Sequence, residues 1–76
     1  MATYNIEVTD TFGGEANYCW VRRHTVTAKS MRGAVQKLAR IEGSGWVSDY
    51  DDGTAARYNL KGACICAFIE ECWDND

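Results

Sequence analysis

Four cysteines are the residues of this chain with the most distinctive chemistry. Cys64 and Cys66 are separated by one residue, while Cys19 and Cys72 lie apart from them. Four thiolates can hold structural zinc, but such sites usually take their ligands in pairs from C-x-x-C turns. A C-x-C pair in a strand puts both sulfurs on the same side instead. We therefore expect small, reduced, buried thiols, with no metal and no other cofactor.

The single histidine, His24, is the other candidate for catalysis. Two arginines precede it, and Glu7 is one possible cross-strand neighbour. A catalytic pair with Cys19 would join residues five apart on one strand, and this spacing places the two side chains on opposite faces. The acids of residues 49–52 lack the spacing of a calcium loop, and the glycine pairs lack that of a phosphate loop. We expect no catalytic residues, and a protein that is not an enzyme.

The charge of the chain is unevenly distributed along the sequence. The net charge is -3, but residues 1–21 carry three acids and no Lys or Arg, and residues 22–40 carry six Lys or Arg and no acid. Residues 41–76 carry eight acids against two bases. The chain is therefore bipolar, and its average charge says little about any one face.

The pattern of residues 1–28 predicts two antiparallel strands. Apolar and polar residues alternate over residues 3–9, which indicates a strand with one buried face. The glycine pair at 13 and 14 permits a reversal, and the chain then returns as a long strand over residues 16–28. Neither side of this second strand is apolar throughout, so a bulge is expected near residues 21–23.

A helix follows, with Ser30 as its expected N-cap. Apolar residues recur every three or four positions and form one stripe of Met31, Ala34, Val35, Leu38, Ala39 and Ile41. Gly43 is expected to end the helix in the left-handed conformation. Gly33 weakens the first turn by about 1 kcal/mol relative to Ala, a cost better tolerated where a helix lies close to a sheet. The outer face is cationic and presents Arg32, Gln36, Lys37 and Arg40.

Three shorter segments, residues 46–50, 56–60 and 63–69, complete the expected sheet. The last has no polar side, so it should lie at the centre of the sheet or be covered on both faces. The order is ββαβββ, or ββαββ if one late strand is irregular. This predicts a single α+β domain over residues 1–76, in which one helix packs on one face of an antiparallel sheet of four to five strands. The opposite face should be open.

The N-terminal residues show no signal peptide, and no apolar run is long enough to cross a bilayer. We therefore expect a cytoplasmic protein that does not bind membranes. Six large aromatic residues exceed what so small a core encloses, and some should lie on the open face or at a sheet edge: Tyr18, Trp20, Trp46, Tyr50, Tyr58 and Trp73. Exposed Tyr and Trp beside Arg are typical of protein interfaces, although aromatic pairs that shield a sheet face explain them equally well.

Residues 24–39 form a strand that ends in Val-x-Ala and continues through a polar cap into an Ala-rich helix. This layout resembles very small phage-encoded proteins, and over residues 3–69 it is similar in build to anti-CRISPR proteins that inhibit type I surveillance complexes. The resemblance implies no enzymatic activity and stoichiometric binding to a Cas subunit of the effector complex. It also implies interference with DNA recognition or nuclease recruitment.

The resemblance, together with the charge pattern, implies a phage-type inhibitor that binds a host nucleoprotein defence complex. Its expected contacts are Arg22, Arg32, Gln36, Lys37, Arg40, Asp51 and Asp52. The first alternative is a nucleic-acid-binding module that uses the basic helix face. The second is a homo-oligomeric structural protein, such as a homodimer, in which basic and acidic faces of different copies meet. A fourth interpretation is that the basic residues of the helix are simply solvated and bind no partner.

Overall fold

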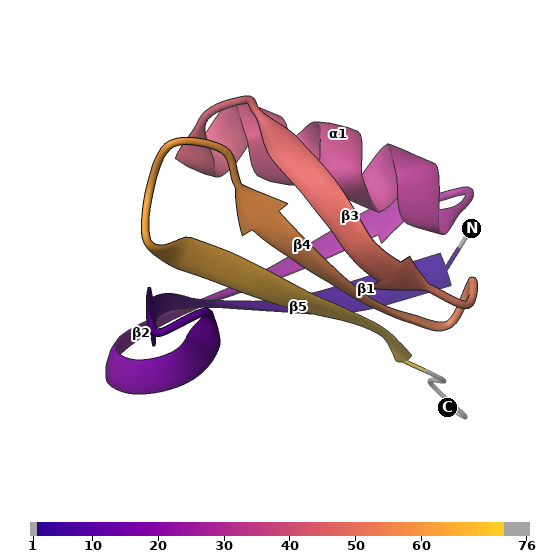
Figure 1. The fold of residues 1–76 in the computed structure, drawn as a ribbon. Coiled ribbons are helices and arrows are strands. Elements are labelled where there is room, and N and C mark those ends of the chain that lie inside the picture. The colour runs from indigo at the N-terminus through magenta and orange to yellow at the C-terminus, as the bar shows by residue number, and fades with distance from the viewer. Residues whose placement is uncertain (1, 73–76) are drawn as a thin grey trace.

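The computed structural model describes residues 2–72, which form one five-stranded sheet and one helix (Figure 1). The elements are β1 (Ala2–Phe12), β2 (Glu15–Ala28), α1 (Met31–Glu42), β3 (Trp46–Asp51), β4 (Ala55–Leu60) and β5 (Ile65–Cys72). All strand pairs are antiparallel, and the spatial order is β2-β1-β5-β4-β3. The predicted ββαβββ order and α+β class are confirmed.

The apolar alternation of β1 determines which face of the sheet meets the helix. Tyr4, Ile6 and Val8 are buried in the core with residues of α1, and the odd-numbered residues of β1 face the other way. β5 lies between β1 and β4, which confirms the central position expected from its lack of a polar side. The full core comprises Tyr4, Ile6, Val8, Ala28, Met31, Ala34, Leu38, Ala56, Ala67 and Ile69.

Ser30 caps α1 as predicted, because its side chain accepts a hydrogen bond from the Gly33 amide at 3.3 Å. Two details of the helix prediction are wrong. Gly43 has a positive φ of 101°, but its ψ of 163° places it outside the left-handed helical region, and its amide bonds to the Ala39 carbonyl. Ile41 is 49% exposed, so the buried stripe of α1 does not extend to it.

Gly33 brings α1 unusually close to the last residue of β2. A methyl group at Gly33 would lie 3.2 Å from the Cβ atom of Ala28, which is closer than ordinary van der Waals contact. Ala28 is itself 3% exposed. The close approach of helix and sheet expected from a glycine in the first turn is therefore present.

The bulge of the β1–β2 hairpin lies at a different place from the one predicted. Thr9 pairs with Val21 and Thr11 with Ala16, so the four residues 17–20 lie opposite Asp10 alone. The Asp10 carboxylate accepts hydrogen bonds from the Cys19 amide at 2.8 Å and from the Asn17 side chain at 2.9 Å. Residues 21–23 are regular instead, because this carboxylate stabilises the extra residues nearer the turn.

The curled hairpin covers part of the sheet face opposite α1 (Figure 1). The Arg57 guanidinium, on this face of β4, donates a hydrogen bond to the Gly14 carbonyl at the hairpin turn, at 2.7 Å. Thr9 and Cys66 also face away from the helix, yet both are fully buried. The expectation of an open face is therefore wrong for this half of the sheet.

In the described part of the chain, no helix combines the length and the apolar character that crossing a membrane requires.

Candidate functional site

A shallow groove runs along α1 beside the end of β2. It has a volume of about 270 Å³ and is lined by Ala28, Lys29, Gly33, Gln36, Lys37 and Arg40. We call this feature the α1 groove. Arg32 is exposed on the same helix, one residue before Gly33. The structure thus brings together four of the predicted contacts, Arg32, Gln36, Lys37 and Arg40, and adds Lys29, which sequence reasoning did not select.

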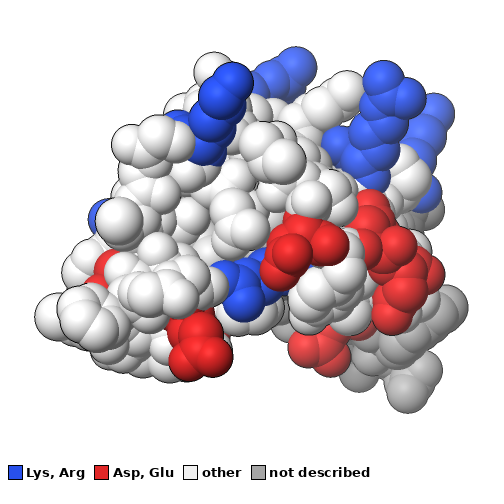
Figure 2. Space-filling view, viewed as in Figure 1, with Lys and Arg blue, Asp and Glu red and all other residues white. Residues whose placement is uncertain are grey.

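Among the residues that the structure describes, the cations of this surface form no ion pair with a carboxylate. Within residues 2–72, the ion pairs involve Arg22, Arg23, His24 and Arg57 but none of the basic residues at the α1 groove. Lys37 Nζ donates to the backbone carbonyl of Thr27, a neutral group. Figure 2 shows basic side chains along the rim where α1 runs and most acidic side chains below it. An anionic partner would be attracted to this rim.

Arg22 has a different environment from the helix cations. Its Nε and one terminal nitrogen each donate to a carboxylate oxygen of Glu42 at 2.8 Å, and its guanidinium lies 4.4 Å from the ring centre of Trp20. The hydrogen bond from Arg22 holds the pKa of Glu42 below its usual range, and the same bond raises the pKa of Arg22. This predicted contact residue therefore ties β2 to the end of α1.

His24 contacts the same carboxylate. Its Nε2 lies 2.8 Å from Oε2 of Glu42, the oxygen that also accepts from Arg22 Nε. The neighbour considered from the sequence, Glu7, pairs with Arg23 instead, at 3.3 Å. His24 faces the helix because it lies opposite Ile6, whereas Glu7 and Arg23 face away from it. Glu7 is not the partner of His24, because the two residues occupy opposite faces of the sheet.

Asp51 and Asp52 stabilise the turn between β3 and β4. Asp51 accepts from the Gly53 amide at 2.8 Å and from the Tyr58 hydroxyl at 3.0 Å. Asp52 accepts from the amides of Thr54 and Ala55, and the hydrogen bond from Ala55 is the main reason that the pKa of Asp52 is lowered. β3 is the opposite edge of the sheet from β2. These two predicted contacts thus belong to a different edge from the one beside the α1 groove.

The cysteines do not all behave as the buried thiols that the sequence predicts. Cys66 is buried, and burial raises the pKa of its thiol. Cys19, Cys64 and Cys72 are exposed instead, because they lie in the bulge, in a turn and at the end of β5. Among residues 2–72, no three His, Cys, Asp or Glu side chains gather in a way that could hold a metal ion.

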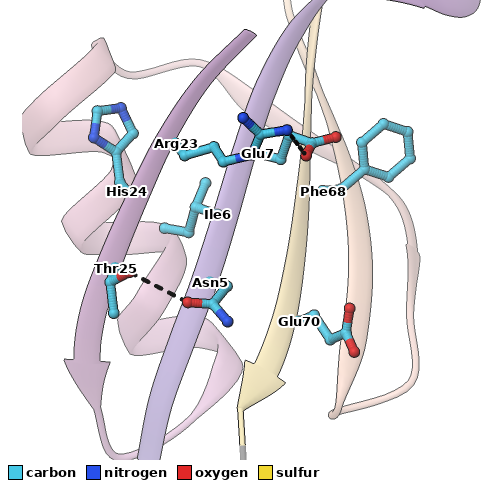
Figure 3. A pocket seen from close by; sticks show the side chains of 8 residues that line it. All are labelled: Asn5, Ile6, Glu7, Arg23, His24, Thr25, Phe68 and Glu70. Atoms are coloured by element: carbon cyan, nitrogen blue, oxygen red, sulfur yellow. Dashed lines mark hydrogen bonds and ion pairs between the residues drawn. The ribbon is translucent and has the colours of Figure 1, made fainter.

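The part of the outer sheet face that the hairpin leaves free contains a second depression, of about 340 Å³ (Figure 3). Arg23 and Glu7 pair across it, and the Thr25 hydroxyl donates to the Asn5 side chain at 3.2 Å. The alternation of β1 predicts that Asn5 and Glu7 share a face. The same alternation does not predict the contribution of β5, whose residues Phe68 and Glu70 also line this depression.

Two of the aromatic residues that the sequence places outside the core are well exposed. Tyr18, in the bulge, is 54% exposed, and Tyr50, on the edge strand β3, is 50% exposed. Trp46 is partly buried, and its ring nitrogen donates to the Gly43 carbonyl at 2.8 Å. Trp73 lies outside the described residues.

Comparison of the chain with protein-family models, with curated proteins and with solved structures found no match.

Proposed function

We propose that the chain is a non-catalytic inhibitor that binds a larger macromolecule through the α1 groove and Arg32. The observation that carries the binding role is the gathering of Lys29, Arg32, Lys37 and Arg40 at one side of α1, without an ion pair among residues 2–72. The choice of partner follows from the layout of the chain. We propose a Cas subunit of a type I CRISPR surveillance complex.

Electrostatic complementarity sets the chemistry of the docking site on that partner. The cations of the α1 groove require a surface rich in carboxylates, because like charges would repel the helix. Gln36 lies within the groove and supplies both a hydrogen-bond donor and an acceptor. A chain of 76 residues bound in this way would block DNA recognition or nuclease recruitment by occupying space on the complex.

The test measures binding of the folded chain to a purified type I surveillance complex and the capture of target DNA by that complex. In the variant Arg32→Glu with Arg40→Glu, we expect binding to weaken by about tenfold or more, because each reversal replaces an attraction by a repulsion. DNA capture, blocked by the unmodified chain, should return.

The matched control is Lys61→Glu. Lys61 is exposed in the turn between β4 and β5, away from the α1 groove, and it forms no ion pair within residues 2–72. Its reversal should leave binding and inhibition unchanged. Equal losses in both variants would show that net charge alone matters, and no binding by the unmodified chain would overturn the proposed partner.

Direct binding of nucleic acid is the second candidate, since the same unpaired cations would contact phosphates. Four phosphate contacts predict that the logarithm of the binding constant falls with the logarithm of salt concentration with a slope of roughly -3.6. Binding to a bare 20-mer duplex with this slope, abolished by the double reversal, would favour the nucleic acid over the Cas subunit.

A further inference from the structure

Within residues 2–72, the outer edge of β2 presents backbone groups that no other strand uses. In the described part of the chain, β2 is the last strand on its side of the sheet, and its only strand partner there is β1. In an antiparallel pair, successive residues point their amide and carbonyl groups alternately toward the partner and away from it. The question is which residues of β2 point outward.

Three contacts give the same answer. The Thr27 carbonyl accepts from Lys37 Nζ, so its backbone is directed away from β1. The Thr25 and Asn5 side chains are hydrogen-bonded to each other. Side chains lie closer in antiparallel pairs whose backbones are not bonded to each other, which is consistent with a Thr25 backbone that points away from β1. The Thr11 amide bonds to the Cys64 carbonyl, which directs the odd-numbered residues of β1 toward β5 and the even-numbered ones toward β2.

The backbone groups of Val21, Arg23, Thr25 and Thr27 therefore face outward. Lys37 covers the carbonyl of Thr27, and among residues 2–72 the amides and carbonyls of the other three have no strand partner. This stretch is regular, because the bulge of the hairpin ends before Val21. An unpaired, regular stretch of this kind is a template for one further strand.

The opposite edge of the sheet is protected against such pairing. β3 has six residues and is interrupted by a register shift between Ser48 and Tyr50. Asp49 lies within that shift and Asp51 follows it, and bulges and charges of this kind discourage an added strand. The two edges therefore differ, and β2 is the one that can accept a partner.

Charge determines which strand fits. β2 carries Arg22 and Arg23 and no acid between Val21 and Ala28, and Lys29 follows at its end. Arg23 is 74% exposed and has only a 3.3 Å contact with Glu7. A second β2 would bring arginines against arginines, which is unfavourable across strands. An acidic strand would meet the opposite charge.

We infer that the edge of β2 from Val21 to Thr25 binds an acidic, extended segment of a partner protein as a sixth strand of the sheet. The backbone groups of Val21, Arg23 and Thr25 form the hydrogen bonds, and Arg23 selects an acidic residue on the outer face. None of the residues 21–25 lines the α1 groove, and this inference does not depend on the proposed function of that groove.

The probe is a nine-residue peptide of alternating Glu and Val, titrated into ¹⁵N-labelled protein and followed by amide chemical shifts and hydrogen exchange. On binding, the amides of Val21, Arg23 and Thr25 should become protected from exchange. The amides of Arg22 and His24 already face β1 and should change little. A peptide with Lys in place of Glu should bind about tenfold more weakly.

Two variants test the site. Thr25→Pro removes an outward amide and should abolish binding, whereas Ser48→Pro on the β3 edge should not. Arg23→Gln keeps the backbone intact and should weaken binding at least threefold, which keeps the test valid if Thr25→Pro does not fold. The double reversal Arg32→Glu with Arg40→Glu should leave peptide binding in place, so the two proposals fail separately.

Several results would overturn the inference. Protection without the odd–even alternation, or equal binding of the Glu and Lys peptides, would exclude a strand selected by charge. A mass that rises with concentration, with shifts at both β2 and β3, would identify a second copy of the chain as the occupant.

Discussion

Glu42, the last residue of α1, binds Arg22, in the middle of β2, through two hydrogen bonds of 2.8 Å. The Glu42 side chain is 11% exposed, and the same carboxylate accepts a hydrogen bond from His24 Nε2 at 2.8 Å. These hydrogen bonds connect the C-terminal end of the helix to the edge strand. At the other end, the helix packs closely against this strand through Gly33 and Ala28. Arg22, which belongs to the basic segment 22–40, therefore has a structural partner.

Replacement of Glu42 by Gln should lower the free energy of unfolding by about 1 kcal/mol. The amide keeps the shape of the side chain but loses the charge-assisted bonds to Arg22, and solvent around the half-exposed guanidinium limits the loss. Urea unfolding measures the change. The control Glu15→Gln alters an exposed carboxylate at the start of β2 and should be neutral; equal effects of both changes would refute a specific role of Glu42.

The same contact predicts a dependence of stability on pH. Since Arg22 holds the pKa of Glu42 below its usual range in the folded chain, the ionised carboxylate stabilises the fold. This contribution is present above the pKa of unfolded Glu, about 4.3, and is lost as pH falls through the lower folded value. Between pH 5 and pH 3, wild-type stability should therefore fall more steeply than that of Glu42→Gln, as urea unfolding at each pH would show. Parallel curves would contradict this assignment.

The local patterns were sufficient to predict the elements of the fold. Alternation in β1, the Ser30 cap and the apolar β5 each depend on neighbours in the sequence, and each has the predicted place. The outer face of α1 was predictable for the same reason, because helical spacing alone puts Arg32, Gln36 and Arg40 on one side.

The remaining features depend on contacts between distant residues. Arg57 and Gly14 are 43 positions apart, and no local pattern connects them. The extra residues of the hairpin lie where the Asp10 carboxylate accepts their hydrogen bonds, which apolar alternation cannot reveal. Arg22 looked like a free cation because its partner, Glu42, is 20 positions away.

Close packing between α1 and β2 predicts a coupling between Gly33 and Ala28. Gly33→Ala alone should change the free energy of unfolding by less than about 0.5 kcal/mol, because a gain of about 1 kcal/mol in helix propensity is offset by crowding against Ala28. In the Ala28→Gly background, the same change should stabilise by about 1 kcal/mol. A double-mutant cycle in urea measures the difference.

The exposed Gln36, one turn further along α1, supplies the control for this cycle. Gln36→Ala should change the free energy of unfolding by the same amount whether residue 28 is Ala or Gly. Additive effects of Gly33→Ala and Ala28→Gly would contradict the steric explanation.

The bond between Arg57 and Gly14 predicts that the hairpin protects the thiol of Cys66. In a chain whose other three cysteines are changed to Ser, Cys66 should react slowly with iodoacetamide, because it is fully buried and burial raises its pKa. Arg57→Met removes the donor to Gly14 and should raise the rate about tenfold, the factor expected when a bond of about 1.5 kcal/mol to a charged group is lost. If the hairpin opens locally, the reaction rate should rise by more than the loss of global stability in Arg57→Met explains.

The control Arg32→Met removes an exposed cation from α1 and should leave the reaction rate unchanged. An unchanged rate in Arg57→Met would show that the hairpin covers Cys66 without this bond.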